Sequence, residues 1–356
     1  MSSATDFTLL PDLAVRTLGG AVIWADDESF AEKENLIRPE ASTYQPATFG
    51  HKGQVYDGWE TRRRRRPHGG APASEDCDTA IVRLGVPGVV RGAIVDTAWF
   101  KGNYPPEVSV EAIAVQGYPS AAGIAALEGW TPLVARSKIA GDSENPFPVD
   151  SEQRFTHVRL RIYPDGGVAR LRVHGLAKPD LRWLDSGPFD LAALENGGRV
   201  ADCSNRFYSH PQNLLMPGRA RMMGDGWETA RRRDADNDWV QVRLTGEGVL
   251  RMVEIDTSYF LSNSPGAAAL TGIRADGTEV QLLPRTDLQP DTRHRFALEV
   301  TEPVVQARLD VYPDGGFARL RLFGTLTSAA RDQLRAEDVL GPEVDLAADE
   351  LYDGTE

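Results

Sequence analysis

The segment from Asp57 to Pro67 reads DGWETRRRRRP and puts five consecutive arginines directly behind an acidic and aromatic cluster. Guanidinium groups bind carboxylates and phosphates through paired hydrogen bonds, whereas carboxylates accept N–H groups or take protons from water. The pattern is therefore compatible with nucleic-acid binding, with a targeting signal and with a site for a small anion. The rest of the chain decides between these three.

Net charge argues against a polyanionic partner. The 356 residues include 39 Lys and Arg against 52 Asp and Glu, which gives a formal net charge of -13. A field of this sign repels DNA and RNA, so only a local patch could hold them, and that binding would weaken steeply with salt. We therefore expect no nucleic-acid partner.

The arginine motif occurs twice. DGWETARRR starts at Asp225, and a second pair of segments, VDTAWFKGN from Val95 and IDTSYFLSN from Ile255, also ends an apolar run with an acid, aromatics and an amide. A targeting signal needs no aspartate, tryptophan and glutamate ahead of its basic run in both copies. Acids beside arginines at the end of a strand favour a site for a small polar ligand in the loops.

A structural interpretation of the same residues stays open. The Asp-Gly steps can be turns followed by an edge strand with solvated arginines, and Asp96 can cap a turn. If the run is a strand, alternation places Arg62 and Arg66 on one face and Arg63 on the other.

The chain consists of two similar halves, and this repetition indicates which domains position these motifs. The repeated segments keep their order, while the offset between copies falls from 178 at Asp12 and Asp190 to 149 at the two YPDGG segments. This pattern indicates a tandem duplication of a module of roughly 150 residues, with longer loops in the first copy. We predict domains at residues 1–180 and 189–326, followed by an acidic tail at residues 327–356.

Each copy has the signature of β-structure. HVRLRIYPDGGVARLRVHG, from His157 to Gly175, alternates apolar and polar residues on both sides of an Asp-Gly step, which predicts a hairpin. Helical periodicity is confined to short pieces. The predicted fold class is all-β, with two tandem jelly-roll β-sandwiches.

These paired motifs resemble the allantoicase (allantoate amidinohydrolase) family. The resemblance runs from about Asp12 to Gly324 and rests on the DGWET, VDTAWFKGN and YPDGG segments with their repeats. It implies two galactose-binding-like jelly rolls and the hydrolysis of allantoate to ureidoglycolate and urea in purine breakdown. In place of the family's usual Gly-His-Asp-Trp step, this chain has EDCDTAIVRLG and DNDWVQVRLT, with no histidine in either copy. The second copy has FLSN where the family tends to have FKGN.

Allantoate carries one carboxylate and two ureido groups, so it suits a site that joins arginine and acid. We predict Glu60, Lys101 and Asp96 as catalytic residues, with Glu60 activating water and Lys101 assisting the departing urea. Arg62 or Arg64, or Arg231 or Arg232 in the second copy, would hold the substrate carboxylate. The predicted substrate-binding residues are Asp57, Trp59, Arg62, Arg64, Asn103, Asp225, Glu228, Arg231, Asp256 and Asn263.

Several alternatives stay open at this point. The site can lie in the first copy, in both copies or between them, and the motifs do not fix which acid does which job. A non-catalytic tandem module that binds a small polar ligand is a rival from another class, and a hydrolase of a related ureide is the nearest enzymatic rival.

No other catalytic signature competes with this interpretation. The six histidines have no metal-site spacing, so we predict no metal or other cofactor, although Asp and Glu could hold Mn²⁺ or Mg²⁺ without a signature. The chain has only two cysteines, no secretory start and no membrane span. We expect a cytoplasmic protein and a homo-oligomer.

Overall fold

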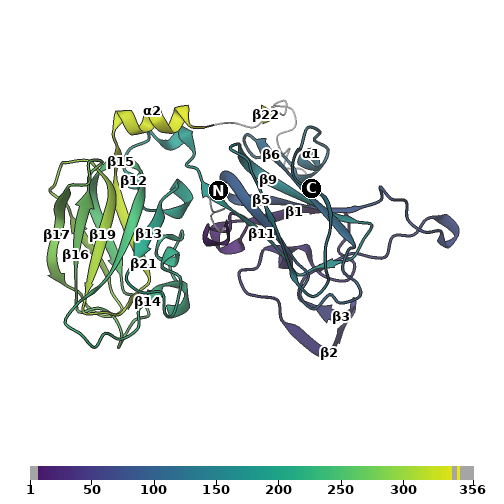
Figure 1. The fold of residues 1–356 in the computed structure, drawn as a ribbon, viewed down its shortest axis with the longest axis horizontal. Coiled ribbons are helices and arrows are strands. Elements are labelled where there is room, and N and C mark those ends of the chain that lie inside the picture. Colours follow the sequence, from purple (N-terminus) through teal and green to yellow (C-terminus); the bar gives the residue numbers. More distant parts are fainter. Residues whose placement is uncertain (1–6, 339–342, 345–356) are drawn as a thin grey trace, which may run out of the picture. The chain divides into compact units, whose positions relative to one another are not determined.

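The computed structural model describes residues 7–338 and 343–344 and divides into two compact units (Figure 1). Unit 1 holds the described residues up to Leu176 together with Glu343 and Val344, and unit 2 holds Ala177 to Asp338. Both units are built mainly of β-strands, with short helices at their ends. The predicted all-β fold of two tandem sandwiches is confirmed.

The strands of unit 1 form one antiparallel system with two small ladders beside it. They are β1 (Ala21–Ala25), β2 (Tyr44–Gly50), β3 (Gly53–Tyr56), β4 (Trp59–Glu60), β5 (Asp78–Asp96), β6 (Glu107–Val115), β7 (Thr131–Lys138), β8 (Glu144–Pro148), β9 (Arg154–Tyr163), β10 (Gly167–Val168) and β11 (Arg170–Ala177). The short helices of this part are η1 (Phe7–Leu9), η2 (Arg16–Leu18), η3 (Lys33–Ile37), η4 (Pro67–Gly69) and α1 (Ala121–Ala125).

Unit 2 repeats this order of elements. Its strands are β12 (Phe189–Asp190), β13 (Arg199–Cys203), β14 (Trp227–Glu228), β15 (Asp238–Asp256), β16 (Ala267–Ile273), β17 (Glu279–Asp287), β18 (Arg293–Ala297), β19 (Val304–Tyr312), β20 (Gly316–Phe317) and β21 (Arg319–Leu326). Its helices are η5 (Leu181–Trp183), η6 (Leu194–Asn196), η7 (Pro211–Leu215), η8 (Met223–Asp225) and α2 (Ser328–Ala336). Helix α2 and β22 (Glu343–Val344), which pairs in parallel with β6, are the described parts of the predicted acidic tail.

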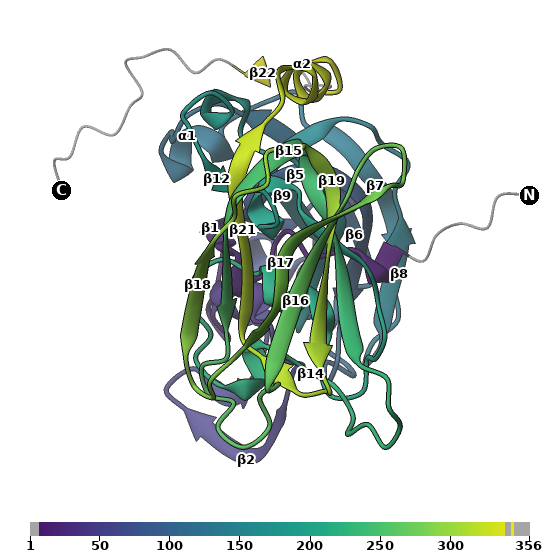
Figure 2. The ribbon, with the colours of Figure 1, turned by 90° about the vertical axis from the view of Figure 1, so that its left-hand side faces the viewer.

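One long strand in each unit belongs to both layers of its sandwich. The first half of β15 pairs with β13 and β19, whereas its second half pairs with β18 and β21. Strand β5 pairs with β1 and β9 first and with β8 later. Strands that pass from one sheet to the other in this way make the corners of a sandwich. Figure 2 shows β16, β17, β18 and β21 of unit 2 running along the sandwich.

The predicted YPDGG hairpin is wrong. Strands β19 and β21 do not pair with each other but lie on opposite sides of β15, because the turn crosses from one layer to the other. The alternation of apolar and polar residues along each strand correctly indicates that one face is buried. It does not show which other strand pairs with it. Arg170, one of the polar residues in this alternation, is also only 1% exposed, so the polar positions of the segment do not all face solvent.

The layers close over apolar cores. In unit 1, Phe100 and Phe155 are fully buried, and Phe260 and Phe317 are fully buried in unit 2. A Cβ atom on Gly167 would lie 2.1 Å from the Phe100 ring, so the backbone after the YPDGG turn packs directly on this aromatic residue. This packing fixes the turn beside the segment that leads to Asn103.

Candidate active site

A cavity of about 910 Å³ opens among the loops of unit 1. Its walls come from four parts of the chain that are distant in sequence, which are Phe30 and the segments 53–72, 102–106 and 164–166. The lining residues are Phe30, Gly53, Gln54, Tyr56, Glu60, Thr61, Arg63, Arg64, Arg65, Gly69, Gly70, Ala71, Pro72, Gly102, Asn103, Tyr104, Pro106, Pro164, Asp165 and Gly166. Glu60, Arg64 and Asn103 are the predicted site residues that the structure places there.

Glu60 is one of two carboxylates that line this cavity within the described residues, the other being Asp165. It lies in the short strand β4 opposite Gly167 and is only 9% exposed. Its Oε1 atom accepts a hydrogen bond of 2.8 Å from the Asn103 side-chain amide. Within the described residues, Oε2 accepts no hydrogen bond from the protein, so this oxygen is available to water or a ligand.

Burial raises the pKa of Glu60 above its ordinary value of 4.5. The Asn103 hydrogen bond and the nearby charge of Arg63 act in the opposite direction and oppose part of that rise. A carboxylate with a raised pKa is a better proton acceptor than an ordinary one, which suits a general base.

The five arginines divide into two sets, of which one forms ion pairs with aspartates and the other does not. Arg62 is bound to Asp27 at 2.6 Å, Arg64 to Asp78 at 2.6 Å, and Arg66 to Asp76 at 3.5 Å. Arg63 and Arg65 line the cavity and make no ion pair within the described residues. Successive side chains of an extended segment point in opposite directions, so the acids hold one set and leave the other beside Glu60.

Backbone contacts fix this segment in place. Asp165 of the YPDGG turn accepts the Arg64 N–H at 2.7 Å, and Thr61 and Gly166 exchange backbone and hydroxyl hydrogen bonds of 3.1 and 3.2 Å. The Arg62 N–H donates to Asp27 at 2.7 Å. The YPDGG turn therefore positions the arginine run.

Asp57 and Trp59 support the cavity but do not line it. Both oxygens of Asp57 accept from the buried guanidinium of Arg170 at 2.9 Å. Although burial alone would raise the pKa of Asp57, hydrogen bonds from Arg170 and Thr43 lower it overall. Trp59 is fully buried, and its indole N–H donates to the Asp27 carbonyl at 2.7 Å. These contacts hold the start of β4 on the sandwich.

Asp96 and Lys101 also lie outside the cavity lining. Asp96 accepts the Ala98 N–H at 2.8 Å, as a turn cap does, and burial and the Glu144 charge are among the effects that leave its pKa raised. The Lys101 side chain is 72% exposed, with its Nζ atom 3.6 Å from Asp142. Neither residue contacts Glu60 in this structure, and their predicted catalytic roles stay predictions.

Unit 2 repeats the central pair of the site. Asn263 donates to the Glu228 carboxylate at 2.7 Å, as Asn103 does to Glu60. Asp225 is paired with Arg221 at 3.1 Å, and Asp256 is almost fully buried and caps the Ser258 N–H at 2.9 Å. Arg231 is exposed at the position that matches Arg63.

Sequence reasoning missed several cavity residues with reactive groups, among them Tyr56, Arg63 and Arg65. Tyr56 ends β3, and its ring stacks on Phe100 with 5.1 Å between centroids. Burial raises the pKa of Tyr56, and the Glu60 charge raises it further. Alternation along the arginine run was the available signal for Arg63, whereas Tyr56 lies in a loop segment with no counterpart motif in the second copy.

Within residues 7–338 and 343–344, no three His, Cys, Asp or Glu side chains lie close enough together to hold a metal ion. None of the helices found there has the length and apolar character to cross a membrane.

The fold and the cavity define a β-sandwich protein with a small-molecule site in its loops. A family model described as the allantoicase repeat matches residues 11–178 and 189–327. A probable allantoicase of Nocardia farcinica is 65% identical, over 90% of this chain and 95% of the relative. The chain therefore belongs to the allantoicase family, and the resemblance inferred from its motifs is confirmed.

More distant relatives agree with this assignment. The allantoicase of Dictyostelium discoideum is 39% identical over 86% of this chain and 84% of its own length. The crystal structure of allantoicase from Saccharomyces cerevisiae superposes with a TM-score of 0.75 at 32% identity, and the match covers 89% of this chain and 93% of that one.

Proposed function

We propose that this chain hydrolyses allantoate to ureidoglycolate and urea in the cavity around Glu60. The observation that carries the proposal is a buried carboxylate, held by Asn103, in the same cavity as two guanidinium groups that make no ion pair with the described residues. The relatives named allantoicase supply the reaction, and the cavity supplies groups that match each end of the substrate.

The arginines that line the cavity suit the charged end of allantoate. A guanidinium group and a carboxylate form two parallel hydrogen bonds, which fix both position and orientation. Arg63 is the stronger candidate because its charge acts on Glu60, so it lies close enough to hold the substrate beside the base. Arg64 lines the cavity too, but its side chain is already bound to Asp78.

Glu60 is placed to act as the general base. The reaction breaks one bond between the central carbon and a ureido nitrogen and forms a bond from that carbon to the oxygen of water. Glu60 takes a proton from the water through its free Oε2 atom, while Asn103 holds Oε1. The departing ureido nitrogen needs a proton to leave as neutral urea.

Tyr56 is the group of this cavity that we assign as the proton donor to urea. Its ring stacks on Phe100, and a tyrosine hydroxyl carries its proton at neutral pH because its ordinary pKa is 10.0. The sequence favours Lys101 for this role, but that side chain is largely exposed and paired with Asp142. Lys101 stays a proposal, with a smaller expected effect.

A urea-release assay on purified chain with allantoate tests the function. We expect turnover by the wild type and a loss of about 10²–10⁴-fold in kcat for Glu60→Gln, the usual contribution of a general base. Glu128→Gln, an exposed residue between α1 and β7 in the same unit, is the matched control. If the wild type binds allantoate and releases no urea, the chain is a non-catalytic binding module.

Three further properties are part of the proposal. We place the protein in the cytoplasm, supported by the absence of a disulfide between Cys77 and Cys203, both free. We expect a homo-oligomer with no nucleic-acid partner, which light scattering and a binding assay with duplex DNA at low salt would measure. Protein groups supply the base and the anion site, and the urea assay with and without chelator tests whether Mn²⁺ or Mg²⁺ contributes.

A further inference from the structure

The second repeat keeps the framework of the first site nearly contact for contact. Asn263 donates to Glu228 at 2.7 Å, and Glu228 lies opposite Gly316 as Glu60 lies opposite Gly167. Thr229 and Gly315 exchange hydrogen bonds of 3.3 and 3.1 Å. The framework that presents a carboxylate beside an amide is therefore present in unit 2.

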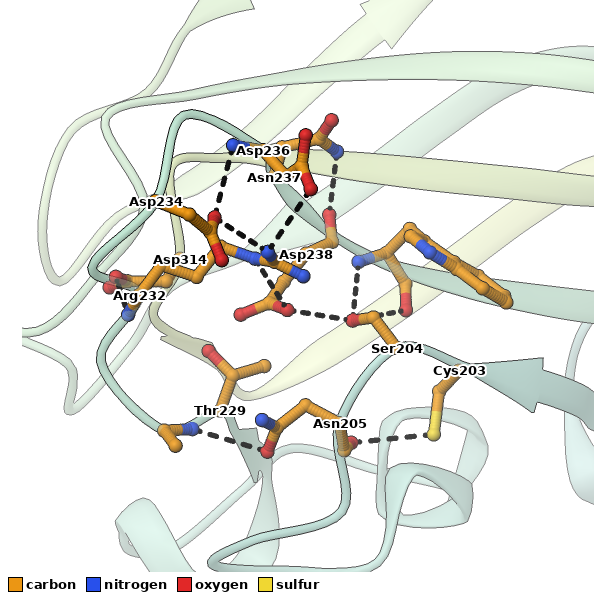
Figure 3. A network of polar contacts seen from close by, with 12 residues as sticks. Cys203, Ser204, Asn205, Thr229, Arg232, Asp234, Asp236, Asn237, Asp238 and Asp314 are labelled. Atoms are coloured by element: carbon orange, nitrogen blue, oxygen red, sulfur yellow. Dashed lines mark hydrogen bonds and ion pairs between the residues drawn. The ribbon is translucent and has the colours of Figure 1, made fainter.

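The arginine segment of the second repeat is anchored in the same way. Arg232 is held through its backbone by Asp314 at 2.7 Å and through its side chain by Asp234 and Asp238 at 2.8 and 3.1 Å (Figure 3). Arg231 and Arg233 flank it and are exposed, with no ion pair in the described part of the chain. Two guanidinium groups therefore remain available for an anion, as in unit 1.

The two repeats differ in the walls of the site. Seventeen residues separate Pro39 from Asp57, but seven separate Pro217 from Asp225. Twelve residues lie between Arg65 and Asp78, but four lie between Arg233 and Asp238. The longer segments of the first repeat supply seven of the cavity's lining residues, which are Gly53, Gln54, Tyr56, Gly69, Gly70, Ala71 and Pro72.

Without these walls the second carboxylate is open to water. Glu228 is half-buried, whereas Glu60 is buried. Tyr208, at the position of the cavity residue Phe30, is 63% exposed and packs edge-on against Phe207 at 4.7 Å. An open aromatic surface with a carboxylate, an amide and guanidinium groups retains polar recognition but lacks the water exclusion and the Tyr56 hydroxyl of the first site.

We infer that the second repeat is a second binding site, built around Glu228, Asn263 and Arg231, that takes a small ureido carboxylate and does not cleave it. Glu228 accepts the ureido N–H groups, and the exposed guanidinium groups take the carboxylate. Allantoate and its product ureidoglycolate share this chemistry. The inference rests on the proposed function, because the ligand class comes from the first site.

Calorimetric titration of the full chain tests the inference. The Glu60→Gln chain is titrated with allantoate, and Glu228→Gln is added to it in a second protein. We expect the Glu60→Gln chain to bind an equivalent of ligand that the added Glu228→Gln abolishes or weakens at least tenfold. Glu279→Gln, an exposed residue of β17 in the same unit, is the matched control and leaves this equivalent unchanged. An unchanged stoichiometry and affinity in the double variant would overturn the second site.

Urea release separates this inference from the proposed function. The Glu60→Gln chain retains an intact second repeat, and we expect it to release no urea above background. If it retains activity that Glu228→Gln then removes, the second repeat cleaves and the inference fails. If the activity persists in the double variant, the role of Glu60 fails instead. Titration with ureidoglycolate in place of allantoate shows whether substrate or product is held more tightly.

Discussion

The two repeats show how one framework supports two different environments for the same pair of side chains. Glu60 with Asn103 and Glu228 with Asn263 form hydrogen bonds of 2.8 and 2.7 Å on equivalent short strands. The difference lies in two loop segments, which enclose Glu60 and leave Glu228 open. The sandwich therefore fixes the glutamate and asparagine side chains relative to each other. The loops determine whether the carboxylate is desolvated enough to act as a base.

Apart from the loss of the base itself, the largest effect on kcat is expected from removing the wall that the second repeat lacks. Tyr56→Ala deletes both the ring that closes the cavity and its hydroxyl, so kcat for urea release should fall by about 10²-fold or more. Tyr56→Phe keeps the ring and isolates the hydroxyl. Equal activity of the wild type and both variants would contradict the importance of this wall.

Breaking the anion site should raise KM more than it lowers kcat. Arg63→Gln removes a guanidinium group from the cavity, and the loss of a charge-assisted pair costs ~1.5–3 kcal/mol, or about 10- to 150-fold in kcat/KM. Arg62→Gln is the matched control, because its side chain is bound to Asp27 and is 72% exposed. A larger defect in Arg62→Gln than in Arg63→Gln would reverse the assignment.

The pH dependence of kcat/KM reports the protonation of Glu60. Burial raises the pKa of Glu60, and Asn103 and Arg63 partly oppose this rise. Because a base acts when deprotonated, kcat/KM should fall as pH drops through this pKa, which lies above 4.5. Asn103→Ala removes an opposing contact and should move the acid limb to higher pH. A limb that stays in place would show that Asn103 does not act through Glu60.

The same raised pKa predicts a modest stability effect. A carboxyl group whose pKa is higher folded than unfolded stabilises the fold when protonated, and this contribution is lost as pH rises through the folded pKa. Glu60→Gln should therefore raise Tm by more at pH 8 than at pH 4, as measured by thermal unfolding. An equal Tm difference at both pH values would argue against a desolvated carboxylate.

The smallest effect on kcat is expected from Lys101, which lies outside the cavity lining. Lys101 is exposed and 3.6 Å from Asp142, so Lys101→Met should change kcat by no more than about twofold, as expected for a surface pair. A loss of tenfold or more at unchanged Tm would restore the role that the sequence favours for this lysine.

The fold was readable from the sequence because duplication and alternation are both local signals. Two sandwiches follow from the repeated motifs and the period of two, and Glu60 and Asn103 follow from their place at the ends of strands. Strand partners were not readable, since the YPDGG turn joins opposite layers while its flanking strands alternate as in a hairpin.

The roles of individual charges were less predictable, because they depend on partners far away in sequence. Asp57 looks like a ligand acceptor until Arg170, 113 positions later, is seen to bind both of its oxygens. Arg62 and Arg63 are adjacent arginines that cannot be distinguished by sequence. They differ because Asp27 lies where it binds the Arg62 side chain. Tyr56 could not be found by comparing copies, because the second repeat has no equivalent segment.

The direct test of the unit 1 site is a crystal structure of the Glu60→Gln chain with allantoate. We predict the ligand in the unit 1 cavity, with its carboxylate on the Arg63 guanidinium and a ureido group within hydrogen-bond distance of Asn103 or of the substituted position. Allantoate bound with an empty unit 1 cavity, or with its carboxylate away from both Arg63 and Arg65, would contradict it.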